Sequence, residues 1–429
     1  MDVHQLYQLY LKTRLISTDS RKILPGSVFF ALKGENFNGN QFALQALENG
    51  ASAAIVDDEA VKSHPGIFRV DNTLAALQAL AAYHRLQSGI VILAITGSNG
   101  KTTTKELCRA VLSKKYIVYA TGGNLNNHIG VPLTLLAMNE DVQIGIVEMG
   151  ANHPGEIREL CQIARPDYGI ITNVGKAHIE GFGSIEGVAK AKGELFQHLV
   201  ANQKTIFLNE GSRHLKNAIP YDYKYVISYN SDRGIRVKSK RNNPLLELEV
   251  TDGKISFELK TNLLGSYNAE NILAACCVGL HLGVPFPLVR EAVCDYRPQN
   301  HRSQLIDSGK NRIFMDAYNA NPSSMRAAID EFLLLHGAGK MMILGEMREL
   351  GNSDQAEHLE LVHYLQEKEV TQVFCVGKSF EQCLNGTEFL YFPNADEVSA
   401  YLNEHPVTGR FILIKGSRAN KLEKILPLL

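Results

Sequence analysis

The sequence predicts an α/β protein of three domains, and three observations support this class. Short apolar segments alternate with helix-like segments along all 429 residues. Two of these segments, 143–150 and 168–174, are continuous apolar runs, which are typical of strands buried on both faces of a parallel sheet. The alternation of strands and helices restarts near residue 300. A chain of this length forms several domains of ordinary size, each with its own core.

The first predicted domain, residues 1–87, is a small α/β unit. Residues 27–32 (SVFFAL) and 52–57 (SAAIVD) are short apolar runs, which predicts two strands. Residues 41–50 between them form a helical segment that ends on glycine. An alanine- and leucine-rich helix at 73–86 closes the domain.

The second predicted domain, residues 88–299, begins with a strand at 90–96, a glycine-containing loop and a helix at 101–112. Further strand–helix units follow, so a central parallel sheet is expected. Residues 245–250 (LLELEV) and 254–259 (KISFEL) alternate more regularly between apolar and polar side chains. This pattern predicts an antiparallel β ribbon added to the parallel sheet.

The third predicted domain, residues 300–429, is an open, mainly parallel sheet of Rossmann-like type. A helix is expected over 321–336, because Asn321 is a favourable N-cap and Pro322 occupies the first helical position. The expected strands are 312–317, 340–345, 371–377 and 410–416.

The composition excludes several classes of protein. The formal net charge is −1 and no long basic run occurs, which argues against nucleic acid as the main partner. The seven cysteines contain no C-x-x-C pair, which fits a reducing compartment better than a disulfide framework. Neither a signal peptide nor an apolar run of about 20 residues is present. We therefore expect a cytoplasmic enzyme that acts on small molecules.

The loop at 95–104, ITGSNGKTTT, has the features of a phosphate-binding loop between a strand and a helix. Gly97 and Gly100 permit a close approach of the backbone, and Lys101 supplies a point charge. The hydroxyl of Thr102 can be placed on Mg²⁺. The usual pattern has a glycine six residues before the lysine, where this chain has Ile95. The alternative is an ordinary glycine-rich turn with a solvated lysine.

Three more residues are candidates for metal or catalytic roles. Glu148 ends an apolar strand, where α/β sheets place their ligands, so its carboxylate is expected to hold a metal rather than cap a helix or form an ion pair. His178 lies just beyond the next strand, and Lys192 lies in a helical stretch. Considered alone, these two residues are better explained as a structural histidine and a solvated helix lysine.

Four segments together resemble the Mur ligase family, ATP-dependent amide ligases that build the peptide of peptidoglycan. The phosphate loop of this family lacks the distant glycine, which accounts for Ile95. The matching segments are GSNGKTTT (97–104), VEMGANHPGEI (147–157), NVGKAHIEGFGS (173–184) and AKAKGELF (189–196).

Other segments resemble the members of the family that add the terminal dipeptide. DAYNANP (316–322) is the most discriminating, because members that add the third residue carry a D-N-P-R type motif instead. The resemblance implies an ADP-forming ligase that joins D-alanyl-D-alanine to UDP-N-acetylmuramoyl-tripeptide through an acyl phosphate, in peptidoglycan precursor synthesis. The remaining similar segments are 17–56, 121–136, 263–275, 343–351 and 413–418.

The resemblance also implies roles for individual residues. ATP would be bound by Gly97, Asn99, Gly100, Lys101, Thr102, Thr103, Asn268, Asn271, Arg302 and Asp316. Two Mg²⁺ ions are implied, one held by Thr102 and Glu148 and the other by His178 and a carbamylated Lys192. Lys101, His178 and Lys192 would be catalytic. Lys190 is a nearby alternative to Lys192 as the carbamylated residue.

The substrates would contact residues from all three domains. The implied set is Ser20, Arg21, Asn124, Asn126, Asn127, Asn319 and Asn321. The sequence departs from the family at three positions. Tyr267 replaces a histidine near the adenine, and Asn38 and Asn40 replace the Asp and His of an F-D-G-H motif in the uridine-binding domain, which puts the exact uridine contacts in doubt.

Two other functions fit parts of the sequence. A folylpolyglutamate synthase shares the glycine loop and the metal-binding residues but lacks the first domain. A non-catalytic nucleotide-binding protein would keep the fold without turnover. We expect small-molecule substrates, no nucleic acid, no membrane span and a monomer. No motif decides between lysine and another diamino acid as the third residue of the tripeptide, or between open and closed domain arrangements.

Overall fold

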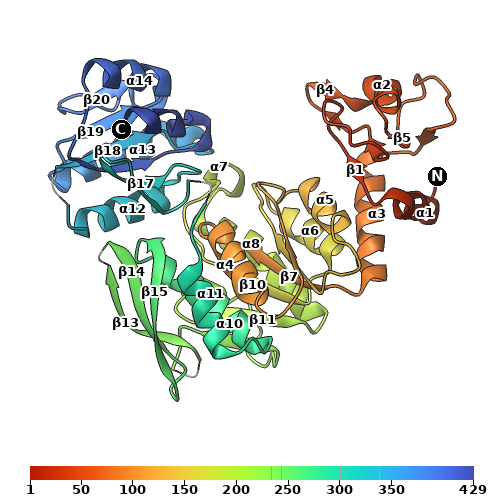
Figure 1. The fold of residues 1–429 in the computed structure, drawn as a ribbon, viewed down its shortest axis with the longest axis horizontal. Coiled ribbons are helices and arrows are strands. Elements are labelled where there is room, and N and C mark those ends of the chain that lie inside the picture. Colours follow the sequence, from red (N-terminus) through yellow and green to blue (C-terminus); the bar gives the residue numbers. More distant parts are fainter. Residues whose placement is uncertain (233, 243, 300, 338) are drawn as a thin grey trace.

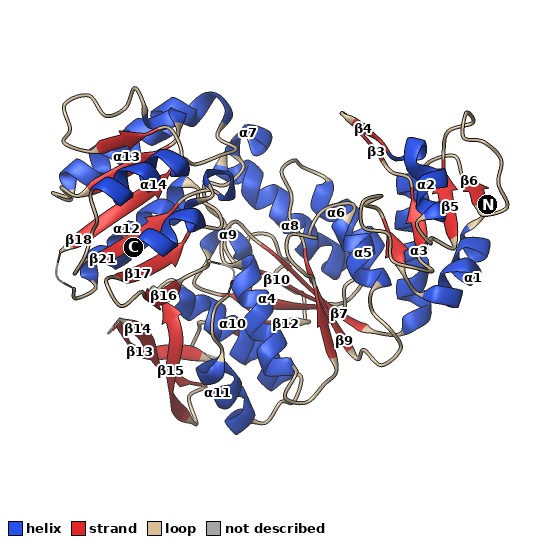
Figure 2. Cartoon of the chain, turned by 45° about the horizontal axis from the view of Figure 1, so that its top comes forward, coloured by secondary structure: helices blue, strands red, loops and turns tan. Residues whose placement is uncertain are grey.

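The computed structural model describes residues 1–429 except 233, 243, 300 and 338. Its elements form three groups along the chain, at the upper right, the bottom and the upper left of Figure 1. Helices flank the sheets of all three groups (Figure 2), which confirms the predicted three-domain α/β class. We keep 1–87, 88–299 and 300–429 as working limits of the N-terminal, central and C-terminal domains. None of the helices in the described part of the chain could span a bilayer.

The N-terminal domain has a four-stranded sheet in the order β1-β2-β5-β6, with all neighbours parallel. The predicted strands at 27–32 and 52–57 are present but shorter. The predicted helix at 41–50 begins as a 3₁₀ turn, because the Asn38 side chain caps that turn. The elements are α1 (Val3–Thr13), β1 (Ile16–Ser17), β2 (Val28–Phe30), β3 (Lys33–Gly34), β4 (Phe37–Asn38), η1 (Gly39–Phe42), α2 (Ala43–Glu48), β5 (Ala53–Val56), β6 (Ile67–Arg69) and α3 (Thr73–Ser88).

Helix α1 was not predicted from the sequence. Asp2 and Gln5 form a reciprocal capping box at its start, in which each side chain accepts from the other residue's backbone N–H. Leu6 and Tyr10 are buried four residues apart on one face of the helix. The helix therefore packs beside α3 at the base of the domain.

The central domain has a six-stranded, fully parallel sheet in the order β12-β11-β10-β7-β9-β8. Its elements up to the last strand of this sheet are β7 (Val91–Thr96), α4 (Lys101–Leu112), β8 (Val118–Ala120), α5 (Gly130–Leu136), β9 (Ile144–Glu148), α6 (Glu156–Ala164), β10 (Tyr168–Ile171), α7 (Ile179–Phe182), α8 (Ile185–Ala201), β11 (Thr205–Asn209), α9 (Arg213–Lys216) and β12 (Val226–Tyr229).

The register of this sheet gathers three strand ends at one point. Ile95 of β7 pairs with Glu148 at the end of β9, and Thr96 pairs with Ile171 at the end of β10. In a parallel sheet such carboxyl ends share one edge, where ligands bind. The loop after β7 therefore lies between the segments that follow β9 and β10.

The predicted two-stranded ribbon is a three-stranded antiparallel sheet, so that prediction was incomplete. Residues 236–242 add a strand whose outer position tolerates the exposed charges that hid it from the hydrophobic pattern. The elements that complete the central domain are β13 (Arg236–Asn242), β14 (Leu245–Thr251), β15 (Ser256–Leu264), α10 (Asn268–His281) and α11 (Phe286–Asp295).

The C-terminal domain has a six-stranded sheet in the order β16-β17-β21-β18-β19-β20, parallel except for β16. Asn321 caps α12 and Pro322 opens it, as predicted. The elements are β16 (Gln304–Asp307), β17 (Arg312–Asp316), α12 (Pro322–Leu334), β18 (Lys340–Gly345), η2 (Gly351–Ser353), α13 (Asp354–Glu367), β19 (Val373–Val376), η3 (Lys378–Phe380), β20 (Leu390–Phe392), α14 (Ala395–Glu404), β21 (Phe411–Lys415), η4 (Arg418–Asn420) and η5 (Leu422–Leu428).

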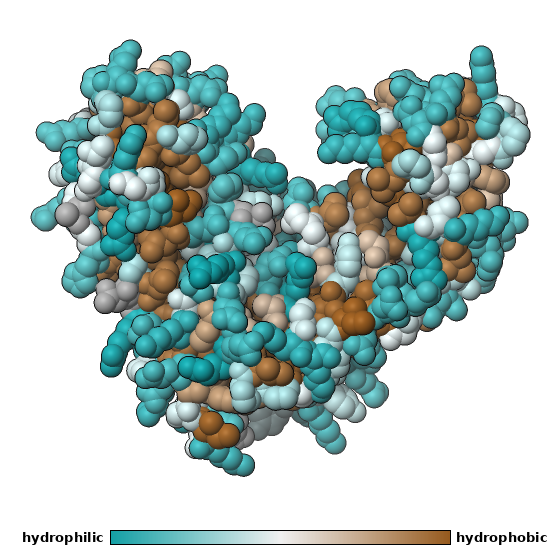
Figure 3. Space-filling model, viewed as in Figure 1, coloured by the Kyte–Doolittle hydropathy of each residue, from teal (hydrophilic) through white to brown (hydrophobic). Residues whose placement is uncertain are grey.

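The hydrophobic cores do not follow the domain limits equally. One core joins Tyr10 and Leu80 of the N-terminal domain to Leu135, Leu160 and Leu195 of the central domain. The C-terminal domain has a core on each face of its sheet, and one of these cores includes a single buried residue of the central domain, Leu264. Figure 3 shows a broad hollow between the N-terminal and C-terminal domains, above the central domain.

Candidate active site

The loop between β7 and α4 has the backbone conformation of an anion-binding turn. Gly97 has a φ of 142° and Gly100 a φ of 78°, in the region that favours glycine. A β-carbon at Gly97 would lie 2.0 Å from Oγ1 of Thr172, and one at Gly100 would lie 2.5 Å from Oδ1 of Asn271. Both glycines are therefore required by conformation and by space. The loop leads directly into the first backbone N–H groups of α4, which are donors suited to an anion.

Lys101 turns back over this loop. Its Nζ donates to the carbonyl oxygens of Gly97 at 2.6 Å and Ser98 at 3.2 Å. Loss of surrounding water lowers the pKa of Lys101, while the nearby Glu148 carboxylate opposes that change and the Arg302 guanidinium adds to it. The amine of this lysine thus lies over the loop, with hydrogen bonds that a phosphate could replace.

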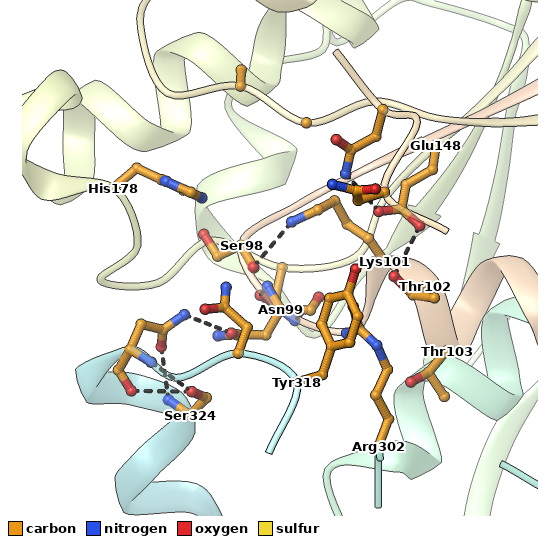
Figure 4. Close-up of a pocket in the computed structure, with 18 of the residues that line it drawn as sticks. Ser98, Asn99, Lys101, Thr102, Thr103, Glu148, His178, Arg302, Tyr318 and Ser324 are labelled. Carbon is orange, nitrogen blue, oxygen red and sulfur yellow. Dashed lines mark hydrogen bonds between the residues drawn. The ribbon is translucent and has the colours of Figure 1, made fainter. Parts of the chain in front are cut away.

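Glu148 lies at the centre of the site and is 3% exposed. One carboxylate oxygen accepts from Oγ1 of Thr102 at 2.9 Å, and the other accepts from Nδ2 of Asn126 at 2.9 Å. Figure 4 shows Glu148 and Thr102 joined beside Lys101. The parallel register explains this meeting, because it brings the end of β9 next to the phosphate loop.

These two residues fit a Mg²⁺ ion that is completed by other ligands. No group of three or more His, Cys, Asp or Glu side chains arranged for a metal occurs among the described residues. Mg²⁺ typically takes only one or two protein carboxylates and fills its other positions with phosphate oxygens and water. The buried carboxylate of Glu148 and the hydroxyl of Thr102 are oxygen ligands of that kind.

His178 reaches into the same space from the loop after β10, and in Figure 4 it points toward Lys101. Its Nδ1 lies 2.6 Å from Oε2 of Glu349 in the C-terminal domain. The angle of this contact at Nδ1 is unfavourable for a hydrogen bond. The buried nitrogen therefore has no hydrogen-bond partner among the described residues. The imidazole nevertheless lowers the pKa of Glu349.

Lys192 is fully buried in α8, whereas Lys190 is exposed. Its Nζ donates to the carbonyl oxygen of Ala151 at 3.1 Å and lies 5.2 Å from the centre of the Phe182 ring. Burial lowers the pKa of Lys192 to about 7, with a further contribution from Lys101. Burial therefore favours the uncharged amine of this side chain.

A chain of buried amides leads from the phosphate loop toward the C-terminal domain. Oγ1 of Thr104 donates to Asn271 at 3.1 Å, and Asn271 donates to Asn268 at 2.8 Å. Asn268 donates in turn to the carbonyl of Leu264 and, at 3.3 Å, to Oγ of Ser303. Asn268 and Asn271 are 1% and 6% exposed, so their positions are fixed by this network.

Tyr267 replaces the family histidine and lies within the same network. Its hydroxyl is 3.2 Å from Oγ of Ser303. Beyond it, the guanidinium of Arg302 lies 3.8 Å from the centre of the Tyr318 ring, and that of Arg418 lies 5.4 Å from it. This end of the site therefore combines an aromatic ring with two cations, a suitable surface for a nucleotide.

The C-terminal domain contacts the phosphate loop directly. Nδ2 of Asn321 donates to Oδ1 of Asn99 at 2.8 Å, while the Asn321 Oδ1 caps α12. Nearby, Lys415 donates to Asp316 at 2.6 Å and to the carbonyl of Asn319 at 3.4 Å. The DAYNANP segment thus faces the nucleotide loop across the domain boundary.

Together these residues enclose a cavity of about 660 Å³ between the central and C-terminal domains. Gly97 and Lys192 are both buried and do not line it. The predicted site residues that line it are Asn99, Gly100, Lys101, Thr102, Thr103, Asn124, Asn126, Asn127, Glu148, His178, Asn268, Asn271, Arg302, Asp316, Asn319 and Asn321.

The structure keeps the predicted uridine residues apart from this cavity. Arg21 is exposed and forms an ion pair with Asp19 at 2.9 Å, next to Ser20. Asn40 is buried, where its Nδ2 donates to Asp57 at 2.9 Å and to Asn38 at 3.0 Å. The two asparagines therefore hold the loop around β4 together, and the roles of Ser20 and Arg21 stay predictions.

Sequence reasoning missed several residues that line the cavity from the C-terminal domain, among them Tyr318, Glu349, Lys415 and Arg418. Each lies in a segment whose resemblance was noted, but only the fold brings it to the phosphate loop. The position of Tyr318 beside Arg302 could have been suspected from the DAYNANP motif. For Glu349 the only available signal was the GEMRELG segment.

Comparison with known proteins now identifies the family. The description "Mur ligase middle domain" matches residues 95–279, "Mur ligase, glutamate ligase domain" matches 301–418, and "Mur ligase family, catalytic domain" matches 12–85. The chain belongs to the Mur ligase family. Its three matched regions correspond to the three groups of elements described above.

Relatives within the Mur ligase family match nearly the whole chain. The UDP-N-acetylmuramoyl-tripeptide--D-alanyl-D-alanine ligase of Bacillus subtilis (strain 168) is 37% identical, covering 96% of this chain and 92% of the relative. Among solved structures, MurF from Acinetobacter baumannii is similar with a TM-score of 0.87, 31% identity and coverage of 96% and 92% of the two chains.

Two further solved structures differ in how similar they are to this chain. MurF ligase from Thermotoga maritima, in complex with ADP, has a TM-score of 0.86 at 28% identity and covers 97% of both chains. A Mycobacterium tuberculosis folylpolyglutamate synthase reaches a TM-score of 0.65 at 14% identity, with coverage of 83% of this chain and 94% of the synthase. The second likeness shows a shared fold alone.

Proposed function

We propose that this Mur ligase joins D-alanyl-D-alanine to UDP-N-acetylmuramoyl-tripeptide in peptidoglycan precursor synthesis, with ATP converted to ADP and phosphate. The observation that carries the proposal is the DAYNANP segment facing the phosphate loop, with Asn321 bonded to Asn99. Full-length likeness to ligases of that name supports the same reaction. Binding at the strand ends of two domains lets three substrates meet in one cavity.

ATP would lie along the cavity from the phosphate loop to the Tyr318 end. The N–H groups at the start of α4 and the ammonium of Lys101 face the phosphates. Lys101 would exchange its bonds to Gly97 and Ser98 for phosphate oxygens. The adenosine would reach the end lined by Asn268, Asn271 and Arg302, as the family resemblance implies.

Mg²⁺ would be held by Thr102 and Glu148 at the phosphate loop, and a second ion by His178 and carbamylated Lys192. When bound, these ions neutralise charge on the phosphoryl group. The residues of the chain provide the fixed geometry, because Glu148 is held by Thr102 and Asn126 before any ligand arrives.

The reaction would proceed in two steps. The free carboxylate of the tripeptide attacks the γ-phosphorus of ATP, and the bond to the ADP oxygen breaks, which leaves an acyl phosphate and ADP. The amine of D-alanyl-D-alanine then attacks the acyl carbon. It loses a proton as phosphate leaves, and an amide bond forms. Asn319 and Asn321 lie on the acceptor side of the cavity and would orient the amine, while Lys101 stabilises charge on the phosphoryl group.

Asn124, Asn126 and Asn127 line the cavity on the central-domain side and would contact the tripeptide. Ser20 and Arg21 would bind the uridine portion at the N-terminal domain. The hollow in Figure 3 leaves room for a substrate that extends from that domain to the phosphate loop. We further propose that the enzyme is a cytoplasmic monomer without a nucleic-acid partner, for which sedimentation of the purified chain is the first test.

We propose that Lys192 is carbamylated. Its lowered pKa of about 7 and full burial support this, because only the neutral amine forms an N–C bond with CO₂, with loss of one proton. The test is Lys192→Ala with Lys190→Ala as matched control. Lys192→Ala should lose activity, and short carboxylic acids should restore part of it. Equal activity of Lys192→Ala and the parent would refute the assignment.

The reaction itself is tested by phosphate release from ATP with purified protein. Release should require both UDP-N-acetylmuramoyl-tripeptide and D-alanyl-D-alanine, and screening lysine against other diamino acids would identify the third residue. If phosphate release does not depend on D-alanyl-D-alanine, the proposed reaction is wrong. Glutamate-dependent turnover on a folate would favour the synthase alternative. ATP binding without any turnover would favour the non-catalytic one.

A further inference from the structure

Glu349 makes an interdomain contact that the proposed reaction leaves without a role. It follows β18 in the C-terminal domain, and its Oε2 lies 2.6 Å from Nδ1 of His178 in the central domain. Both residues line the cavity. Lys101 and Lys192 are also near enough to interact electrostatically with the Glu349 carboxylate. It is therefore a carboxylate that the C-terminal domain places among the catalytic groups.

The backbone on both sides of this contact is in an unfavourable conformation. His178 has a φ of 53° and Glu349 a φ of 64°, in the left-handed region that residues other than glycine rarely adopt. Conformations of this kind are strained and persist only where surrounding structure enforces them. Gly351 also packs tightly, since a β-carbon there would lie 2.8 Å from Cγ of Glu180. The fold thus holds the two loops together at this point.

The chemistry of the pair suggests what the contact does. A carboxylate beside one nitrogen of a neutral imidazole accepts a hydrogen bond from the N–H of that nitrogen, which leaves the lone pair of the other nitrogen free for a cation. Nδ1 of His178 is buried without a hydrogen-bond partner among the residues described, and a small rotation of either side chain would align it with Glu349. The same contact would orient the ring toward Lys101, as Figure 4 shows.

We infer that Glu349 is a positioning residue that orients His178 from across the domain boundary, so that a divalent cation binds well at His178 only when the C-terminal domain is docked. This inference rests on the proposed ligase function. It makes docking of the domain and assembly of the second cation site a single event. A nucleotide bound to the central domain alone would not complete the site.

A second ion pair provides a matched control. Lys176 lies two residues before His178, and its Nζ is 2.8 Å from Oε1 of Glu357 in the C-terminal domain. This pair joins the same loop to the same domain, but its members are outside the set that lines the cavity. Glu357→Gln therefore removes an interdomain ion pair without touching His178.

The test compares the full-length parent with Glu349→Gln, Glu349→Asp and Glu357→Gln. Ring-nitrogen NMR signals of ¹⁵N-histidine, assigned to His178 with a His178→Gln variant, are recorded without nucleotide or metal. The Mg²⁺ concentration that gives half-maximal ADP formation is then measured at saturating substrates.

Glu349→Gln should shift the His178 ring signals and raise the half-maximal Mg²⁺ concentration by about 10- to 100-fold, as for other groups that orient a metal-binding histidine. Glu349→Asp should restore part of both properties. Glu357→Gln should leave the ring signals unshifted and change the half-maximal Mg²⁺ concentration by no more than about twofold. The inference is overturned if Glu349→Gln behaves like the parent, or if Glu357→Gln produces the same changes. If the parent forms no ADP at all, the proposed function fails, while the NMR comparison still tests the positioning role.

Discussion

The two junctions of the central domain are built in different ways. Toward the N-terminal domain, α1 and α3 share a continuous hydrophobic core with α5, α6 and α8. Hydrogen bonds there reinforce apolar packing, such as the one from the Tyr10 hydroxyl to the carbonyl of Leu136 at 2.7 Å. Toward the C-terminal domain, the contacts around the cavity are polar, and they include Asn321 with Asn99 and Glu349 with His178.

The difference indicates which junction can respond to ligands. Separating the first junction would expose apolar surface to water at a cost that grows with the area. Contacts at the second junction can be exchanged for water or for ligand atoms at little net cost, since each hydrogen bond contributes only about 0.5–1.5 kcal/mol. We therefore expect the first two domains to behave as one body and the C-terminal junction to be sensitive to ligands and salt.

The strongest test of the apolar junction is Leu80→Ala in α3. Leu80 is 1% exposed in the shared core, so the substitution should lower the free energy of unfolding by about 2–5 kcal/mol. Urea unfolding measures this. Leu86→Ala in the same helix is the control, because Leu86 is 52% exposed. Equal losses for the two variants would mean that the shared core does not stabilise the protein.

Lys192 tests the effect of a polar group inside the apolar core. Helix α8 belongs to that core, but this side chain is a buried amine. Its pKa in the fold, about 7, lies below the 10.5 of a free lysine, so the unfolded chain binds more protons between these values. Stability should therefore rise with pH from about 7 to 10.5, by up to about 1.4 kcal/mol per pH unit.

Lys192→Met should lose that part of the slope, measured by urea unfolding at several pH values in CO₂-free buffer. Lys190→Met, at an exposed position of the same helix, should keep the slope of the parent. If the free energy of unfolding changes with pH equally in the parent and in Lys192→Met, burial does not lower the pKa of the Lys192 amine.

Asn321 tests the polar junction. Asn321→Ala removes both the N-cap of α12 and the bond to Asn99, and should lower the free energy of unfolding by about 1 kcal/mol. Asn321→Ser keeps a capping side chain that is too short for Asn99. It should retain most of the stability and raise the KM for ATP or D-alanyl-D-alanine by about 2- to 10-fold, the value of one hydrogen bond. An unchanged KM in both variants would leave Asn321 with a capping role alone.

The smallest effect is expected for the ion pair of Lys176 and Glu357, whose side chains are 41% and 14% exposed. A double-mutant cycle with Lys176→Met and Glu357→Gln should give a coupling energy of about 0–1 kcal/mol that declines between 0.05 and 0.5 M NaCl, about the concentrations that bracket physiological screening. A coupling energy that does not change with salt would contradict the expectation that the contacts at this junction can be exchanged for water.

The sequence predicted most strands of the parallel sheets, because buried strands such as Ile144–Glu148 are continuous apolar runs with little ambiguity. It failed where the pattern was mixed, as in the charged strand Arg236–Asn242 and in α1, whose cap and two buried residues are a weak signal. Tertiary contacts decide such elements, and the sequence does not contain those contacts explicitly.

For the site, the sequence indicated the groups that belong to the phosphate loop and its neighbours, since their spacing follows the order of strands. It could not indicate Glu349, which lies about 170 residues from His178 in the chain and meets it only across a domain boundary. Lys192 was also ambiguous from its neighbours alone, and its burial now distinguishes it from the exposed Lys190.

The two hydrogen bonds from Lys101 to its own loop have a consequence for ligand discrimination. With its charge satisfied by the carbonyl oxygens of Gly97 and Ser98, the lysine offers little to a simple anion, which must break those bonds to bind. A triphosphate compensates for their loss through contacts along the whole cavity. We therefore expect inorganic phosphate and sulfate to compete weakly with ATP, so that the abundant anions of a cell leave the loop free for its nucleotide.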